Sequence, residues 1–144
     1  MMQHTPPTIS TGKRISVFGA AGHTGRFVVA ELSRRGWLPV LCGRDVGKLE
    51  AIAREHPEAE VRLASVEDPA SLDRACSGVG LIINCAGPFI DTATPIIAAA
   101  LRNGIHYLDV AAEQSVALAA FERFHDAATR AGILILPSMA FYGG

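Results

Sequence analysis

The sequence predicts a doubly wound α/β fold, in which a parallel six-stranded sheet with strand order 3-2-1-4-5-6 lies between two layers of helices, as in the Rossmann fold. Two observations predict it. Strand-like and helix-like segments alternate along the chain with short connections, which is the pattern of a parallel sheet with helical crossovers. The first strand-like run also leads directly into a turn with three glycines and then into a helix.

The composition indicates a single domain. The chain has 144 residues, of which 49% are hydrophobic and 19% charged, a balance typical of strands covered on both faces. We expect one folded domain over residues 13–144, after a disordered tail over residues 1–12. The net charge of −1 favours neither a nucleic-acid nor a membrane partner. Because the tail lacks a signal peptide's apolar centre and no run approaches the ~18 apolar residues of a membrane span, we expect a cytoplasmic protein.

In the first half of the chain, apolar β-type runs predict strands at 14–18, 38–42 and 60–64, separated by helices at 24–35 and 45–55. Gly36 ends the first helix, since glycine accepts the left-handed conformation of a helix C-cap. Pro57 ends the second, since proline cannot continue a helix. The next helix begins near Pro69, because proline is favoured at a first helical position.

In the second half we expect strands at 79–85, 105–110 and 133–136, with helices at 94–102 and 115–130. Asn103 and Gly104 close the first of these helices, and Gly132 closes the second. Such a sheet places its ligand crevice outside the carboxyl ends of the first and fourth strands, where the strand order reverses.

The glycine turn is the strongest functional signal. Gly19 permits a tight turn, Gly22 lacks a Cβ where a pyrophosphate would approach the backbone, and Gly25 lets the helix lie close to the strand. The helix N-terminus offers free N–H groups to an anion. The Gly-x-x-Gly-x-x-Gly spacing differs from the commonest dehydrogenase motif, and the alternative is a glycine-rich turn that binds nothing. The candidate cofactor-binding residues here are Gly19, Ala21, Gly22, His23, Thr24 and Gly25.

The residues after the second strand favour NADP over NAD as the cofactor, with NAD as the alternative. Arg44 follows Cys42 and Gly43, where a cation accommodates the 2′-phosphate of NADP. Lys48 offers a second charge one helical turn later. Asp45 is interpreted first as the N-cap of the next helix and alternatively as a contact to a ribose hydroxyl. Arg44 has its own alternative, a solvated surface charge.

The loop after the fourth strand contains further candidates for cofactor contact: Asn84, Ala86, Gly87 and Pro88. Small residues at this position let the cofactor ribose and nicotinamide pass close to the backbone. The alternatives are a simple Gly-Pro turn and an asparagine that ties loops together through its amide.

The sequence identifies no catalytic residue. His106, Tyr107, Asp109 and Glu113 gather near the end of the fifth strand, where alternation places His106 and Tyr107 on opposite faces and leaves Glu113 as the better crevice candidate. His125 is expected to pack rather than to transfer protons. No Tyr-x-x-x-Lys pair, hydrolytic triad or metal-ligand spacing is present. Three cysteines are interpreted as reduced core thiols: Cys42, Cys76 and Cys85.

Several motifs occur in an order that resembles the saccharopine dehydrogenase-like family, in the branch with trans-acting enoyl reductases. They are Gly19 to Gly25, Gly43-Arg44 with Lys48-Leu49, Asn84 to Pro88, Gly104 to Asp109, and Glu113, and the resemblance covers residues 13–137. It implies a nicotinamide-cofactor domain followed by a substrate and dimerisation domain. The whole protein would transfer hydride to or from a small molecule, and a homodimer is left open.

The chain departs from the family at two places. Residues 91–95 replace a Tyr-Gly-x-Pro segment, and residues 140–144 stand where a Gly-Phe-Asp-x-x-Pro loop would continue. We therefore expect the C-terminal substrate domain to be absent from this chain, which would then be inactive alone. A non-catalytic NADP(H)-binding module or redox sensor is the second hypothesis. A sugar-nucleotide or quinone reductase is the third, disfavoured by the lack of Tyr-x-x-x-Lys.

Overall fold

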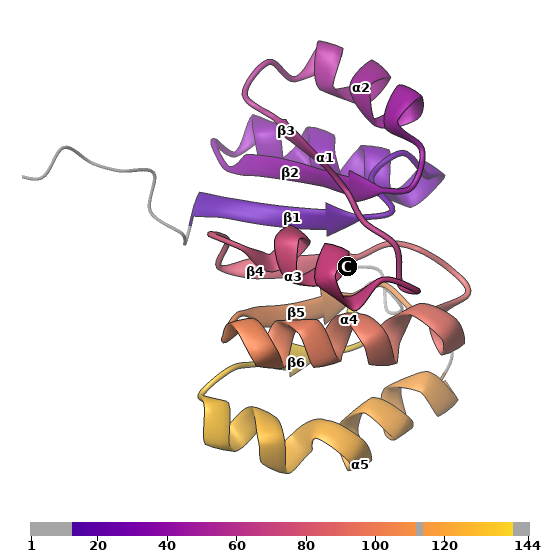
Figure 1. Cartoon of the computed structure of the whole chain (residues 1–144), viewed down its shortest axis with the longest axis vertical. Helices are drawn as coiled ribbons and strands as arrows, with labels where there is room; N and C mark the ends of the chain where they lie inside the picture. Colours follow the sequence, from indigo (N-terminus) through magenta and orange to yellow (C-terminus); the bar gives the residue numbers. More distant parts are fainter. Residues whose placement is uncertain (1–12, 112–113, 140–144) are drawn as a thin grey trace, which may run out of the picture.

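The computed structural model describes residues 13–111 and 114–139, so the expected tail over residues 1–12 lies outside it. Strands and helices alternate throughout the described residues (Figure 1). The elements are β1 (Arg14–Phe18), α1 (His23–Arg34), β2 (Leu38–Gly43), α2 (Val46–Glu55), β3 (Glu60–Leu63), α3 (Pro69–Cys76), β4 (Leu81–Asn84), α4 (Phe89–Asn103), β5 (His106–Asp109), α5 (Gln114–Ala131) and β6 (Ile135–Leu136).

The sheet has the predicted order β3-β2-β1-β4-β5-β6, and every pair of neighbouring strands is parallel. β1 lies between β2 and β4, with Val17 opposite Leu41 on one side and Ile83 on the other. The chain therefore reverses its direction of travel across the sheet at β1 and β4. Their carboxyl ends form the switch point at which such sheets bind ligands.

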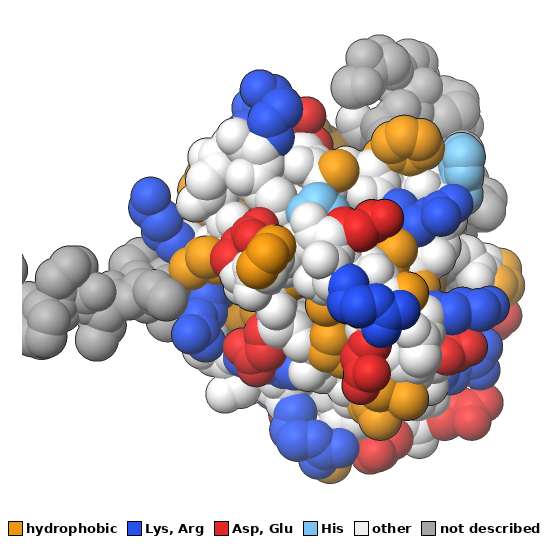
Figure 2. All heavy atoms as spheres, turned by 90° about the horizontal axis from the view of Figure 1, so that it is seen from above, with side chains coloured by type: hydrophobic (Ala, Val, Ile, Leu, Met, Phe, Trp, Pro, Cys, Tyr) orange, Lys and Arg blue, Asp and Glu red, His pale blue; other side chains and the backbone are white. Residues whose placement is uncertain are grey.

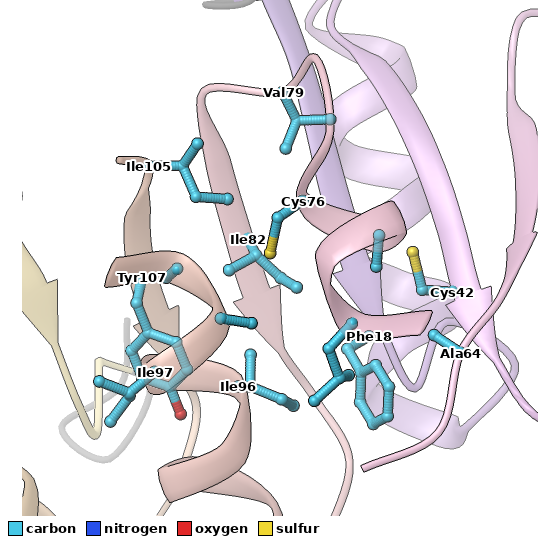
Figure 3. Close-up of a cluster of buried hydrophobic side chains, with 14 of the residues drawn as sticks. Phe18, Cys42, Ala64, Cys76, Val79, Ile82, Ile96, Ile97, Ile105 and Tyr107 are labelled. Carbon is cyan, nitrogen blue, oxygen red and sulfur yellow. The ribbon is translucent and has the colours of Figure 1, made fainter. Parts of the chain in front are cut away.

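Helices cover both faces of the sheet and make two cores (Figure 1). On one face, Val29 of α1 and Leu49 of α2 pack on Val17 and Leu41. On the other, α3, α4 and α5 pack side by side and cover the larger core. Figure 3 shows this core, where Ile82 of β4 faces Ile96 of α4 and Tyr107 of β5 lies beside Ile97.

Three elements begin two or more residues from the predicted position, namely β4, which starts at Leu81 rather than at residue 79, α4 and β6. The prediction starts the helix at residue 94, next to Pro95, but α4 begins at Phe89 and contains Pro95 in its second turn. A proline there leaves the carbonyl of Asp91 without its helical partner, and Asp91 is exposed. β6 begins two residues late, because the Ile133 N–H bonds to Ala128 at the end of α5.

No helix in the described part of the chain is long and apolar enough to cross a membrane. Charged side chains of both signs are interspersed on the end of the molecule where α2 lies (Figure 2).

Candidate functional site

The glycine turn between β1 and α1 has the geometry that the sequence predicts. Gly19 has a φ of +81°, and a Cβ there would lie 2.9 Å from the Cβ of Ala86 in the β4–α4 loop. A Cβ on Gly25 would lie 2.1 Å from the carbonyl oxygen of Gly19, closer than any side chain permits. The turn also bonds to β2, because the Gly19 N–H donates to the Cys42 carbonyl (2.9 Å). Gly19 and Gly25 thus hold α1 and two loops in close contact.

The N-terminus of α1 is open at this turn. Gly22 is the N-cap, with no side-chain cap and no acidic residue in the first turn. Gly22 is exposed, and the nearest atom to an added Cβ is the Gly19 carbonyl oxygen at 3.3 Å. The first N–H groups of a helix have no intrahelical partner, and the helix dipole places partial positive charge there. This end of α1 can therefore accept an anion.

The other predicted residues of the turn differ in exposure. His23 and Thr24 are exposed in the first turn of α1. The His23 ring packs edge-on against Phe27, with 5.3 Å between ring centroids. Ala21 instead packs against the core between α1, α2 and the sheet. The side chains of His23 and Thr24 thus face solvent at the open end of α1, whereas Ala21 packs beneath the turn.

Arg44 lies at the end of β2, beside a cavity of about 520 Å³. It is exposed and forms no ion pair with any residue that the structure describes. A smaller cavity of about 210 Å³, next to β3 and α3, shares Arg44 and also touches Arg74. The larger cavity is lined by Phe18, Arg44, Val66, Glu67, Ala86, Gly87, Pro88, Asp91, Thr92 and Pro95. An unpaired guanidinium thus lies at the mouth of a cavity that runs along the switch point.

Asp45 caps α2, as the first interpretation of the sequence predicts. Its Oδ1 accepts a hydrogen bond from the Lys48 N–H (3.1 Å). The Lys48 side chain is exposed in the first turn of α2 and does not line the cavity at Arg44. Of the two cations that the sequence predicts near the 2′-phosphate, Arg44 is the one beside the cavity.

The β4–α4 loop forms one wall of the cavity, through Ala86, Gly87 and Pro88. The Gly87–Pro88 peptide bond is cis, and both residues are exposed. Asn84 lies beneath the loop with no exposed surface. Its Nδ2 donates to Thr92 Oγ1 (3.0 Å) and to the Tyr107 hydroxyl (3.2 Å), while its Oδ1 accepts from the Ala86 N–H (3.0 Å). The amide ties the loop down, and touching a ligand would require the loop to move.

A buried polar network continues from Asn84 to the end of β5. The Tyr107 hydroxyl donates to Asp109 Oδ2 (2.6 Å), and both residues are fully buried. Asp109 Oδ1 accepts from the N–H groups of Ala111 (3.1 Å) and Ser138 (2.7 Å). Burial and the Asp109 carboxylate raise the pKa of Tyr107 well above its ordinary value. The sequence placed Tyr107 and Asp109 near the site but gave no sign that Thr92 would join them across a loop.

The remaining polar candidates lie elsewhere or outside the described residues. His106 is exposed on the opposite side of β5 from Tyr107, and its Nδ1 accepts from the Leu134 N–H (3.0 Å). His125 is exposed on α5, where it lines a cavity of about 180 Å³ together with Ala128 and Ile133. Glu113 is among the residues that the structure does not describe.

All three cysteines are free thiols, as predicted. Cys42 and Cys76 are buried in the core, and Cys85 is half-buried after β4. Desolvation raises the pKa of each thiol to about 12. They stay neutral near pH 7 and are therefore poor nucleophiles.

The residues at this edge of the sheet fit a dinucleotide with a 2′-phosphate. α1 presents an uncapped N-terminus at the exposed Gly22, and Arg44 stands unpaired beside a cavity. A pyrophosphate satisfies the helix N-terminus, and a guanidinium binds a phosphate by paired hydrogen bonds.

Comparison with known proteins agrees with this geometry. The family model of the saccharopine dehydrogenase NADP binding domain matches residues 15–136, from β1 to β6. This chain belongs to that family. The predicted family resemblance is confirmed, and so is NADP as the cofactor of the domain.

Two relatives show how much of a longer protein the domain represents. The saccharopine dehydrogenase-like oxidoreductase of Mus musculus is 29% identical over 143 residues, which cover 87% of this chain and 33% of the relative. A probable mitochondrial saccharopine dehydrogenase-like oxidoreductase of Arabidopsis thaliana is 32% identical over 140 residues, which cover 87% of this chain and 31% of the relative. The chain spans about a third of the length of the curated relatives it matches.

Solved structures confirm the doubly wound fold. Saccharopine dehydrogenase (L-Glu forming) from Saccharomyces cerevisiae superposes with a TM-score of 0.73 at 16% identity, covering 89% of this chain and 27% of that one. Citrobacter sp. triphenylmethane reductase complexed with NADP(H) gives a TM-score of 0.69 at 23% identity, covering 85% of this chain and 48% of that one. At these identities the likeness shows the fold alone.

The comparisons contradict the expected cytoplasmic location. The Arabidopsis thaliana relative is named as a probable mitochondrial protein. A Dictyostelium discoideum relative, 35% identical over 98 residues, is named as a mitochondrial NADH dehydrogenase [ubiquinone] subunit. The expectation was wrong because it rested on the absence of long apolar segments, and that absence does not identify a compartment.

Proposed function

We propose that this domain holds NADP(H) at the carboxyl edge of β1, β2 and β4, as the cofactor part of an oxidoreductase that transfers hydride to or from a small molecule. The observation that carries the proposal is the pairing of an open α1 N-terminus with the unpaired Arg44 beside the 520 Å³ cavity. When bound, the nicotinamide supplies or accepts the hydride.

Each part of the site then has one role in binding. The first N–H groups of α1 bind the pyrophosphate above Gly22, where a side chain would block it. Arg44 binds the 2′-phosphate, and its planar group can also lie against the adenine. His23 and Thr24 contact the cofactor from α1, and Ala86, Gly87 and Pro88 from the β4–α4 loop. Asn84 positions that loop from beneath.

Parallel calorimetric titrations with NADPH and NADH test the cofactor preference. We expect tighter binding of NADPH, and we expect Arg44→Ala to weaken NADPH binding by about 10- to 150-fold, the equivalent of a lost charged hydrogen bond of about 1.5–3 kcal/mol. NADH affinity should change little. Arg54→Ala is the matched control, since Arg54 is an exposed arginine at the other end of α2. Equal affinities for both cofactors, or unchanged NADPH binding in Arg44→Ala, would contradict this assignment.

A non-catalytic NADP(H)-binding module is the second candidate, and one observation favours it. Among the described residues, the acid and the phenol nearest the end of β5, Asp109 and Tyr107, are fully buried and hydrogen-bonded to each other. Neither is free to exchange a proton with a substrate. In the first proposal, the substrate pocket is completed by sequence equivalent to the rest of the longer relatives.

Turnover assays separate the two candidates. We expect the 144-residue chain to bind NADPH but to reduce no carbonyl, imine or enoyl acceptor over multiple turnovers, because hydride transfer needs a positioned acceptor in a closed site. The same assay on a longer protein with this domain should show turnover. Steady turnover by the 144-residue chain would show that its own residues complete an active site. The absence of turnover in a longer protein that binds NADPH would favour the binding module.

A further inference from the structure

In the hydrogen bonds beneath the β4–α4 loop, the donor and the acceptor of each bond can be assigned, starting from Asp109. Asp109 Oδ1 already accepts from two backbone N–H groups, and Oδ2 accepts from Tyr107. Because an ionised carboxylate only accepts hydrogen bonds, the Tyr107 hydroxyl must donate to it. The Tyr107 oxygen is then left to accept from Asn84 Nδ2. Asp109 therefore determines which way the Asn84 amide is turned.

The orientation of Asn84 in turn fixes the peptide groups of Ala86. Asn84 Oδ1 accepts from the Ala86 N–H (3.0 Å), and Asn84 Nδ2 donates to Thr92 Oγ1. The Thr92 hydroxyl then donates to the Ala86 carbonyl (2.7 Å). Both backbone polar groups of one loop residue are thus held by two buried side chains.

Ala86 is also the loop residue that faces the glycine turn. A Cβ added to Gly19 would lie 2.9 Å from the Ala86 Cβ and 3.0 Å from its Cα and N atoms. The missing Cβ of Gly19 thus lets Ala86 approach the turn closely, and movement of Ala86 away from the turn would break its hydrogen bonds to Asn84 and Thr92. The buried side chains of Asn84 and Thr92 therefore hold the loop at its spacing from the glycine turn, and Thr92 also borders the cavity.

We propose that Thr92, Tyr107 and Asp109 are positioning residues for the dinucleotide: Thr92 directly, and Tyr107 and Asp109 through Asn84, hold Ala86 at a fixed spacing from Gly19. This inference rests on the proposed NADP(H) site. With the network intact, the wall formed by Ala86, Gly87 and Pro88 is in place before the cofactor arrives. Cofactor binding then includes no free-energy cost for ordering the loop. With the network broken, the cofactor must order the loop itself.

Ser16 provides a matched comparison within the same core. The buried Ser16 hydroxyl donates a hydrogen bond to the backbone carbonyl of Ala75 in α3. The Thr92 hydroxyl likewise donates to a backbone carbonyl, that of Ala86. Ala75 lies in a helix rather than in a loop at the site, and Ser16 makes no hydrogen bond to the loops that flank the site. Loss of the Ser16 hydroxyl should lower the thermal stability of the chain without moving the cavity wall formed by Ala86, Gly87 and Pro88.

The experiment compares three variants of the 144-residue chain by NADPH titration and by thermal unfolding. Thr92→Val keeps the shape but removes the hydroxyl, and we expect a five- to tenfold weaker NADPH affinity, on the order of one lost hydrogen bond. Thr92→Ser keeps the hydroxyl and should bind within about twofold of the wild type, the scatter of such measurements. Ser16→Ala should lower the Tm and leave NADPH affinity unchanged.

The outcomes separate this inference from the proposed function. If the wild type binds NADPH and Thr92→Val binds equally well, the network is only structural and the inference is overturned. The same holds if Ser16→Ala weakens binding as much as Thr92→Val, since affinity would then follow global stability. Should Thr92→Val not fold, Tyr107→Phe carries the same expectation and the same contrary result. A wild-type chain that fails to bind NADPH overturns the proposed function, and this inference with it.

Discussion

At the scale of single residues, two glycines of one turn have different roles. Gly25 permits packing, because an added Cβ would meet a backbone oxygen at 2.1 Å. Gly22 differs, because an added Cβ would meet a single backbone oxygen at 3.3 Å, a tight contact that a small shift relieves, and its φ of −77° is accessible to any residue. The sequence motif contains both glycines, and the structure shows that Gly22 is exposed whereas Gly25 is buried.

Gly22→Val should therefore abolish NADPH binding and leave the fold intact, because the branched side chain fills the space above the α1 N-terminus. Titration measures the first effect and circular dichroism the second. Gly25→Ala is the contrasting variant, since its Cβ would force α1 away from β1 and lower the Tm. A folded Gly22→Val protein that binds NADPH normally would show that the glycine turn serves packing alone.

The sequence predicted the site residues that depend on local pattern. The glycine turn and the Asp45 cap follow from residue type and spacing, and the structure has both. Asn84 was assigned two alternatives, and its three buried hydrogen bonds match the one in which its amide ties loops together. Thr92 was missed, because its partners lie on β4 and on the loop and only the folded chain brings them together.

At the scale of elements, local signals placed most boundaries within a residue or two. α3 begins at Pro69, as expected, with Asp68 as its cap. The prediction failed where a local signal had two meanings. The helix predicted from residue 94 begins at Phe89 instead, so Pro95 lies inside α4, and the earlier residues Thr92 and Ala93 are buried in the core. Tertiary packing outweighed the proline signal there.

Asp45→Ala tests whether this residue acts only as the cap of α2. Loss of an N-cap should lower the free energy of unfolding by about 1 kcal/mol, which urea denaturation measures. NADPH affinity should stay unchanged, because the carboxylate already accepts the Lys48 N–H. Asp45→Ser keeps a capping oxygen and should restore most of the lost stability. A marked loss of NADPH affinity in both variants would instead support the ribose contact.

At the scale of the whole molecule, buried thiols and a buried phenol make the free energy of unfolding fall at alkaline pH. The thiols of Cys42, Cys76 and Cys85 have pKa values raised from 9.0 to about 12, and burial raises that of Tyr107 as well. Between about pH 9 and pH 12, the unfolded chain releases thiol protons that the folded chain keeps. Their contribution to stability is therefore constant below about pH 9 and is lost as the pH rises toward 12.

We expect the free energy of unfolding, measured in urea at successive pH values, to fall from about pH 9 upward. Cys85→Ala removes one of these thiols and should make the decline shallower. A free energy of unfolding that stays level between pH 9 and pH 11 would show that the thiols ionise in the folded chain at their ordinary pKa.

The position of β1 between β2 and β4 governs the order in which the chain can fold during synthesis. β1, β2 and β3 leave the ribosome first and can pair with one another, but the other edge of β1 stays open until residues 81–84 have been made. That edge is apolar and fully covered in the finished sheet, and an open apolar edge is a template for pairing with another chain. The nascent chain therefore keeps one edge of β1 open until β4 has been made, and the arrival of β4 both closes that edge and completes the proposed binding crevice.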